Sequence, residues 1–349
     1  MERRIIGSNA RAAAPAAPPS GASAQVSHVR IDEASDGQRL DNFLVKHLKG
    51  VPKSHVYRVI RSGEVRVNKA RAEASTRLAL GDDIRIPPVR VAQPGDAPTA
   101  PAREFPIVFE DEHLLVLDKP AGVAVHGGSG IDFGVIEQLR QARPGAVFLE
   151  LVHRLDKETS GLLVVAKKRS ALVALQDQLR AHGAGKTIVK TYAALVVGAW
   201  PASHKVIDVA LYKYLDADGE RRVRVVEPDH AAAKRSITLV RLAQSFAQCT
   251  LLDVTLKTGR THQIRVHLAH AGHPIVGDPK YGDFSLNRSY ARGSALPGMR
   301  FERMFLHARG LRFAHPADAS AVQFEAPLPA ECRDLIAALS AATPAPDSA

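Results

Sequence analysis

The chain has 349 residues, and its 47 Lys and Arg outnumber its 36 Asp and Glu, giving a net charge of +11 that favours a polyanionic partner, nucleic acid first. This length suffices for one large domain with a buried core and a second, small one. No window approaches the roughly 18 apolar residues of a membrane span, and the two cysteines show no disulfide or metal spacing, so we expect a soluble protein of the reducing cytoplasm without membrane contact.

The first 30 residues are rich in Ala, Pro and Ser and lack the apolar block of a secretory signal. Several prolines oppose the amphipathic helix of an organelle transit peptide. We therefore expect residues 1–30 to form a disordered leader.

Residues 31–90 show the pattern of a small unit with two helices. Apolar residues recur at helical spacing over 40–48, before Gly50, which predicts a first helix. A second helix is predicted from Ser54, taken as its N-cap, to a stop at Gly63. Two alternating segments, 64–68 and 84–86, then predict short strands, so the unit reads as αα followed by β.

The same unit is strongly basic. Between residues 37 and 90 twelve basic and five acidic residues leave a net charge of +7, most of the excess of the whole chain. A merely solubilising surface mixes both signs, so this bias favours binding to a nucleic-acid backbone. The segments RLDNFL, GEVRVN and GDDIRI, with the helix at Ser54, resemble the S4 RNA-binding domain. That resemblance implies RNA contacts from the second helix, for which we name Lys53, Arg58 and Arg61.

The rest of the chain reads as a linker, a larger domain and a tail. Residues 91–104 are rich in Pro, Ala and Gly without periodicity, as linkers are. In residues 105–340 short apolar strands mix with two helices, which predicts an α+β domain with a mixed, mostly antiparallel central sheet and flanking helices. The strands are expected at 114–117, 162–166, 193–197 and 252–256, and the helices near 170–182 and 262–271. Residues 341–349 are expected to be a flexible tail.

The motif HRLDKETSG, residues 153–161, places Asp156 in a basic, turn-prone loop before an apolar strand. A carboxylate held beside a fixed cation can act as a nucleophile or base toward an anionic polymer. An isolated aspartate in such a loop is more often a solvated turn or capping residue, so this reading requires support from elsewhere in the chain.

The segment TGRTHQIRVHLAHAG, residues 258–272, predicts one short helix with Thr261 as N-cap and Gly272 at its end. One stripe of this helix is apolar and packs inward. His262 and Arg265 fall together on another flank, so Arg265 can project toward a site. The alternative is a solvated arginine on an amphipathic helix.

Three histidines on and after this helix, His267, His270 and His273, are spaced like metal ligands. No HExxH motif or carboxylate pair accompanies them, so we expect core or surface histidines and no metal. A metal-dependent nuclease that uses them stays open as a rival. So does a non-catalytic RNA-binding protein in which Asp156 and Arg265 form a structural ion pair.

Taken in order, HRLDKETSG, KTYAALV and TGRTHQIRVH resemble the pseudouridine synthases of the family that modifies large-subunit ribosomal RNA, over residues 37–335. The resemblance implies the pseudouridine synthase fold, large-subunit ribosomal RNA as partner, and isomerisation of uridine without a cofactor. A monomer is favoured because no coiled-coil heptads occur.

The resemblance also implies a role for four residues. Asp156 matches the catalytic aspartate, and Arg265 matches its basic partner. Tyr192, in KTYAALV, matches the tyrosine that stacks on the base and relays a proton, and Arg154 matches the arginine that fills the space left by the flipped base. Further RNA contacts are expected from residues beside these motifs: His153, Thr159, Arg260, His262 and Gln263.

The implied reaction fits these residue types. The N1–C1′ bond of uridine breaks, the uracil turns, and it rejoins the ribose through C5, with no net redox change. One carboxylate can attack C1′ or take the C2′ proton, and the sequence leaves both routes open. Glycoside hydrolases use a carboxylate pair that delivers water, so the single Asp156 of the motif favours isomerisation. Pairing with Arg265 favours the ionised carboxylate.

Overall fold

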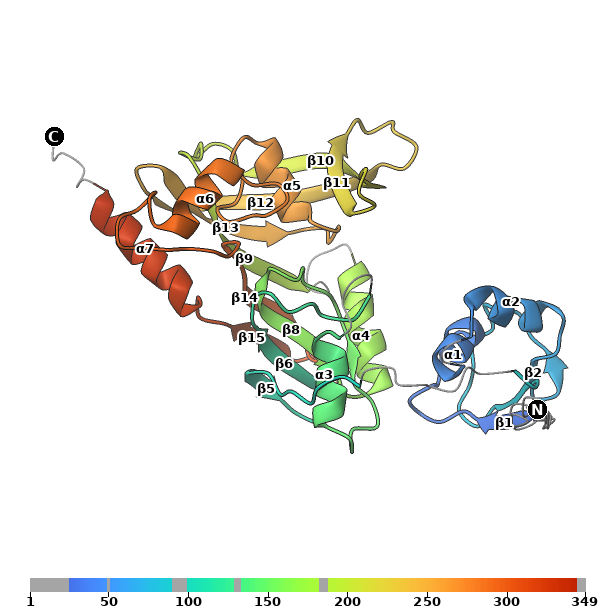
Figure 1. Cartoon of the computed structure of the whole chain (residues 1–349). Coiled ribbons are helices and arrows are strands. Elements are labelled where there is room, and N and C mark those ends of the chain that lie inside the picture. Colours follow the sequence, from blue (N-terminus) through green and yellow to red (C-terminus); the bar gives the residue numbers. More distant parts are fainter. Residues whose placement is uncertain (1–24, 49–50, 90–98, 129–132, 182–187, 344–349) are drawn as a thin grey trace, which may run out of the picture. The chain divides into compact units, whose positions relative to one another are not determined.

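The structure is a computed structural model that describes residues 25–48, 51–89, 99–128, 133–181 and 188–343. The chain divides into two units, Met1–Asp96 and Ala97–Ala349 (Figure 1). Most of the predicted leader, the linker up to residue 98 and the last six residues of the predicted tail lie outside the described residues, so these expectations stay predictions.

The first unit pairs two helices with a four-stranded antiparallel sheet of order β1-β4-β2-β3. Leu40, Leu44, Val56 and Ile84 are fully buried between the layers, so the predicted apolar positions do form the core. The elements are β1 (Ser27–Arg30), α1 (Leu40–His47), α2 (Lys53–Arg61), β2 (Arg66–Val67), β3 (Ala70–Arg71) and β4 (Asp83–Ile86).

Two predictions for this unit are wrong. The leader was predicted to extend to residue 30, but β1 pairs with β4, with Val29 opposite Ile84. A four-residue strand with one central apolar side chain leaves no clear local pattern. Ser54 does not cap α2, because the helix begins at Lys53 with Pro52 before it. The ring of Pro52 fixes φ, here −56°, and so sets the entry into the helix.

The second unit is built on an eleven-stranded sheet of order β11-β10-β12-β13-β9-β14-β8-β6-β5, with β15 added to β14 and β7 to β8. Within the described residues every pair is antiparallel except β8 with β14. The predicted α+β fold with a mixed, mostly antiparallel sheet is thus confirmed. Its strands are β5 (Ile107–Glu110), β6 (Leu114–Lys119), β7 (Glu150–Leu151), β8 (Ser160–Ala166), β9 (Val189–Val197), β10 (Val206–Leu215), β11 (Arg221–Val226), β12 (Lys234–Ser245), β13 (Cys249–Leu256), β14 (Leu306–Ala314) and β15 (Ala321–Glu325).

Helices cover both halves of this sheet (Figure 1). Because β6 and β8 are covered on both faces, they read as continuous apolar runs rather than alternating ones. The helices are α3 (Val135–Ala142), α4 (Arg169–Arg180), α5 (Gln263–His270), α6 (Phe284–Arg292) and α7 (Ala330–Ala342), so α7 includes residues 341 and 342 of the predicted tail. None of the helices in the described ranges has the length and apolarity needed to cross a bilayer.

The parallel contact between β8 and β14 depends on one glycine. Gly161 has φ +108°, and a Cβ placed on it would lie 2.3 Å from the carbonyl oxygen of Ala308 on β14. Only glycine meets both conditions without strain. This close approach places the loop before β8, which contains Asp156, beside β9 and β14 in the middle of the sheet.

We predict that Gly161→Ala destabilises the second unit by more than about 1 kcal/mol and lowers its melting temperature by roughly 2–4 °C or more. The matched control is Gly145→Ala, because no atom lies within 4 Å of a Cβ built at Gly145. Calorimetry of both variants checks this. Equal melting temperatures for the two variants would contradict the role given to Gly161.

Candidate active site

A buried lysine holds the loop that contains Asp156 in place. Lys119, at the end of β6, is fully buried and its Nζ donates to the carbonyl oxygens of Pro120 and Val123, both at 2.8 Å, and of Lys157 at 3.2 Å. Burial lowers the pKa of Lys119 to about 7. The Thr159 amide also donates to the Asp156 carbonyl oxygen at 3.1 Å, so the backbone of the turn is held at both Asp156 and Lys157.

Arg265 joins two carboxylates at the centre of the site. Its side chain is buried, with Nε and Nη2 each donating to Asp278 at 2.7 Å, while Nη1 donates to Asp156 at 3.3 Å. Burial opposes the charge, yet the hydrogen bonds and charge of Asp278, with the charge of Asp156, raise the pKa of Arg265. The solvated arginine considered from the sequence is therefore wrong, and the predicted pairing of Asp156 with Arg265 is present.

Asp278 is in turn held by the backbone. Its Oδ1 also accepts from the amides of Lys280 at 2.8 Å and Tyr281 at 3.0 Å, and its side chain is 1% exposed. The Tyr281 ring lies 5.1 Å from the Arg265 guanidinium. The orientation of Arg265 is therefore set by Asp278 and Tyr281 before any substrate binds.

His262 completes the polar group around Asp156. It precedes α5 in the left-handed conformation, with φ 53°, so the predicted N-cap at Thr261 is wrong. The ring contacts the Tyr281 hydroxyl through Nδ1 at 2.8 Å, and its Nε2 lies 3.9 Å from Asp156. Burial lowers the pKa of His262, which favours the neutral ring. A left-handed non-glycine residue is strained, and such strain is frequent at functional sites.

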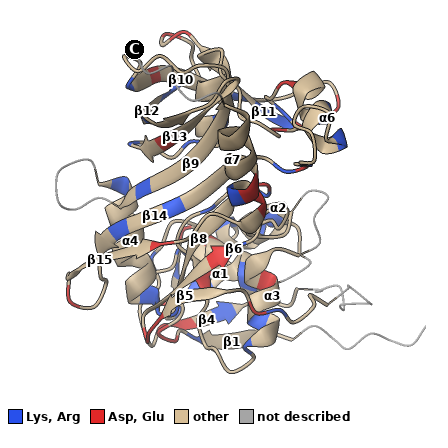
Figure 2. Ribbon diagram, turned by 90° about the vertical axis from the view of Figure 1, so that its left-hand side faces the viewer, with Lys and Arg blue, Asp and Glu red and all other residues tan. Residues whose placement is uncertain are grey.

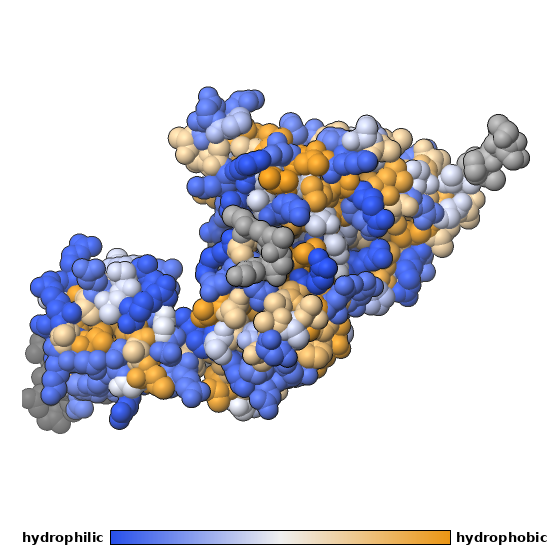
Figure 3. Space-filling view, turned by 180° about the vertical axis from the view of Figure 1, so that it is seen from behind, coloured by the Kyte–Doolittle hydropathy of each residue, from blue (hydrophilic) through white to orange (hydrophobic). Residues whose placement is uncertain are grey.

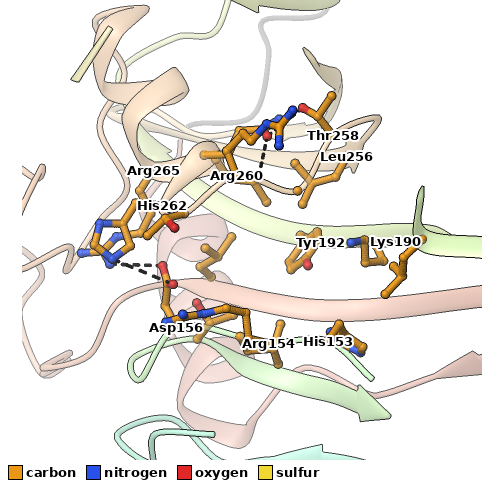
Figure 4. Close-up of a pocket in the computed structure, with 18 of the residues that line it drawn as sticks. His153, Arg154, Asp156, Lys190, Tyr192, Leu256, Thr258, Arg260, His262 and Arg265 are labelled. Carbon is orange, nitrogen blue, oxygen red and sulfur yellow. Dashed lines mark hydrogen bonds and ion pairs between the residues drawn. The ribbon is translucent and has the colours of Figure 1, made fainter. Parts of the chain in front are cut away.

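Tyr192 forms the wall of a cavity of about 500 Å³ beside Asp156 (Figure 4). Burial, with the charge of Asp156, raises the pKa of this phenol, so it stays neutral. The cavity brings together the nine residues that the sequence predicted for this unit: His153, Arg154, Asp156, Thr159, Tyr192, Arg260, His262, Gln263 and Arg265. A second cavity of about 550 Å³ continues on the other side of Asp156, lined by Arg154, Lys157, Lys213, Arg221 and Lys280 among others.

Two of the predicted RNA contacts have their polar groups occupied within the protein. Gln263 is 2% exposed, its Nε2 donates to Ile237 and Thr238, and its Oε1 accepts from Thr258 and the Arg260 amide. The RNA contact predicted for it is therefore wrong, because Gln263 holds the loop before α5. His153 accepts from the Val164 amide through Nε2 at 3.2 Å, and burial together with Lys190 lowers its pKa to about 3.

The remaining predicted contacts differ in exposure. Arg154 and Arg260 are exposed at the cavity wall, whereas Thr159 is 2% exposed. In the first unit Lys53, Arg58 and Arg61 are exposed on α2, although Arg58 lies 3.6 Å from Glu64.

Figure 3 shows hydrophilic residues over much of the visible face of the first unit. The charged side chains of α2 lie on the outside of this unit, around the apolar core between its helices and its sheet.

Two of the three histidines of the metal alternative have other partners. His267 is fully buried and contacts the Ser236 hydroxyl through Nε2 at 2.7 Å, and burial lowers its pKa to about 4. His273 contacts the Val197 carbonyl oxygen through Nδ1 at 2.9 Å. In the described part of the chain no three side chains of the metal-binding types cluster together.

Three residues of the site were missed by the sequence reasoning. Asp278 follows Gly277 in a loop without periodicity, and no motif marked it. Lys119 belongs to an apolar strand, where a lysine that is fully buried has no distinct pattern. Lys190 lies two residues before Tyr192 on β9 and lines the same cavity. The alternation of a strand puts both on one face, so this position was open to prediction.

The chain matches known proteins over most of its length. Residues 113–270 match the family model described as RNA pseudouridylate synthase, and residues 38–84 match the S4 domain. A Haemophilus influenzae protein named ribosomal large subunit pseudouridine synthase C is 49% identical over 309 residues, 87% of this chain and 92% of that protein. The chain belongs to the RNA pseudouridylate synthase family. An Escherichia coli protein of the same name is 48% identical over 312 residues, 88% of this synthase and 93% of that protein.

Two solved structures support the fold of this synthase. Human RNA pseudouridylate synthase domain containing 4 matches with a TM-score of 0.54 and 27% identity, covering 67% of this chain and 93% of that one. Human RNA pseudouridylate synthase domain containing 1 matches with a TM-score of 0.51 and 27% identity, covering 73% and 100%. The resemblances read from the sequence motifs, to this family and to the S4 domain, are thus confirmed.

We predict that Asp278→Asn slows pseudouridine formation by this synthase about 100-fold. The variant lacks the carboxylate that orients Arg265, and a small displacement of a catalytic group lowers the rate by about this factor. RNA affinity should change little. Single-turnover rates and filter-binding titrations separate the two effects.

Asp283→Asn is the matched control. Asp283 lies near Asp278 but caps α6 through the amides of Ser285 and Leu286, both at 2.9 Å. Asparagine is as good an N-cap as aspartate, so this change leaves both the stability and the rate nearly unchanged. Equal rates for Asp278→Asn and the control would contradict the positioning role of Asp278.

Proposed function

We propose that this synthase converts specific uridines of large-subunit ribosomal RNA to pseudouridine, with Asp156 as the residue that acts on the ribose. The observation that carries the proposal is the contact of Asp156 with Arg265, itself fixed by Asp278, at the wall of a cavity that also contains Tyr192. Two relatives are named ribosomal large subunit pseudouridine synthase C, and these names support large-subunit ribosomal RNA as the substrate. The protein works as a cytoplasmic monomer without a cofactor.

The reaction begins with extrusion of the target uridine. Removing a base from its stack costs a few kcal/mol, which new contacts must offset. The ring of Tyr192 stacks on the extruded uracil, and Arg154, exposed between the two cavities, enters the vacancy in the RNA. The extruded nucleotide then places its ribose beside Asp156.

Asp156 then acts on the sugar. Its carboxylate either bonds to C1′ or takes the C2′ proton, and in both cases the N1–C1′ bond breaks and its electron pair stays on the uracil. The uracil turns over Tyr192, and C5 bonds to C1′ as the carboxylate leaves C1′ or after the proton has returned to C2′. The proton on C5 is then lost and N1 takes up a proton. Arg265 donates to Asp156 only at Oδ2, because its other two bonds go to Asp278, so Oδ1 of Asp156 is left to act on the substrate.

The flanks of the site suit an RNA strand. Lys157, Lys213, Arg221 and Lys280 line the second cavity, although Lys280 also pairs with Glu220 at 2.8 Å. Phosphate contacts of this kind position RNA without reading its sequence. The S4-like unit adds the exposed cations of α2 to the same task.

Asp156→Asn should abolish pseudouridine formation while leaving the dissociation constant for ribosomal RNA largely unchanged, because asparagine keeps the shape but removes the nucleophile or base. Mass spectrometry of nucleosides from digested RNA measures the product. Pseudouridine formation by this variant would contradict the role given to Asp156. The same assay on the wild-type protein separates the enzyme from a non-catalytic RNA-binding protein, and cleaved RNA would indicate a nuclease.

Replacing Lys53, Arg58 and Arg61 together with Gln should weaken RNA binding and reduce its salt dependence, by about 0.7–0.9 in the log–log slope for each phosphate that the variant no longer neutralises. The control carries Lys53→Arg, Arg58→Lys and Arg61→Lys, which keep the charge at all three positions. Titrations at several salt concentrations give the slopes. Equal slopes for both triple variants would refute RNA binding by α2.

A further inference from the structure

Lys190 occupies a position in the cavity that the reaction described above does not use. It lies on β9 two residues before Tyr192, on the same face of the strand, and lines the same cavity. Figure 4 shows the Tyr192 ring between Asp156 and the Lys190 side chain. Figure 2 shows basic residues along β9 and β14, the two strands in the middle of the sheet. The cavity thus has a carboxylate at one end and an ammonium group at the other.

No counter-charge within the described residues balances Lys190. No carboxylate of these residues lies within ion-pair distance of its Nζ, and residues 182–187, which precede β9, include no Asp or Glu. Burial lowers the pKa of Lys190, and no acidic group opposes that shift. His153 beside it is neutral, since its own pKa is about 3. A cation held without a partner in a partly buried wall is costly unless an anion enters the cavity.

The reaction generates such an anion. When the N1–C1′ bond breaks, its electron pair remains on the uracil, where the charge spreads over N1 and the carbonyl oxygens O2 and O4. The sugar end of the nucleotide is bound at Asp156, and a base extended over Tyr192 points away from that carboxylate. Its carbonyl edge therefore meets the end of the cavity at which Lys190 lies.

We propose that Lys190 binds and stabilises the detached uracil anion by donating a hydrogen bond from its ammonium group to a uracil carbonyl oxygen. This inference rests on the proposed function. The ammonium keeps its proton throughout. An electron pair of the anion forms the bond from C5 to C1′, the C5 proton is then lost, and N1 takes up a proton. A preorganised charge in a cavity with little water is worth more than the same charge in solution. It also retains the free base in the site while the base turns.

The test compares Lys190→Met with the wild-type protein on two RNAs, one with uridine and one with 5-fluorouridine at the target position. The fluorine withdraws electrons and stabilises the detached anion by itself. We expect Lys190→Met to slow single-turnover consumption of uridine about 100-fold at saturating enzyme, the usual effect of removing one such donor. On the 5-fluorouridine RNA the loss should be several-fold smaller. Lys190→Arg, which keeps the charge, should restore part of the rate.

Lys205→Met serves as the matched control, because Lys205 is exposed and lines neither cavity. Its rates on both RNAs should equal those of the wild type. An equal loss on both RNAs for Lys190→Met, an unchanged rate, or a defect confined to the dissociation constant would overturn the role of Lys190. If the wild type itself leaves uridine unchanged, the proposed function fails instead, so the two failures are distinguishable.

Discussion

The buried guanidinium of Arg265, shared between two carboxylates, is the interaction on which the site depends. A lone carboxylate in this position would lose its hydration when a nucleotide enters the cavity, and a lone arginine could not be buried at this depth. Asp278 neutralises and orients the arginine through two hydrogen bonds of 2.7 Å, while the contact with Asp156 is longer, at 3.3 Å. Asp156 is therefore the weaker of the two partners, and it is the carboxylate that remains directed at the cavity.

The sheet supplies the rigidity that this arrangement requires. Gly161 lets β8 approach β14, Lys119 ties the turn of Asp156 to the end of β6, and Gln263 fastens the loop before α5. Lys119 and Gln263 satisfy buried polar groups, and the glycine at position 161 avoids the clash that a side chain would make there. The reacting groups consequently come from distant parts of the chain but stand on fixed supports, which is what positioning of a substrate demands.

Much of this was open to prediction from the sequence, for reasons that differ from residue to residue. Helical periodicity placed Arg265 apart from the apolar stripe of its helix, and the turn chemistry around Asp156 gave a loop before a buried strand. Asp278 was not predictable, because it lies in an irregular loop and its role appears only when the sheet brings it to Arg265. The N-caps at Ser54 and Thr261 failed because Pro52 and the left-handed His262 set those helix starts. The RNA contact predicted for Gln263 was wrong because its amide nitrogen donates to β12, about 25 residues earlier in the chain, which the local sequence pattern does not show.

The most direct measurement is a crystal structure of the Asp156→Asn variant bound to an RNA stem-loop that contains the target uridine. The account predicts a uridine extruded from the helix, with C1′ beside residue 156, the uracil on the Tyr192 ring and Arg154 in the vacated stack. A target uridine still stacked in the RNA, or one bound away from the cavity between Arg265 and Tyr192, would contradict it.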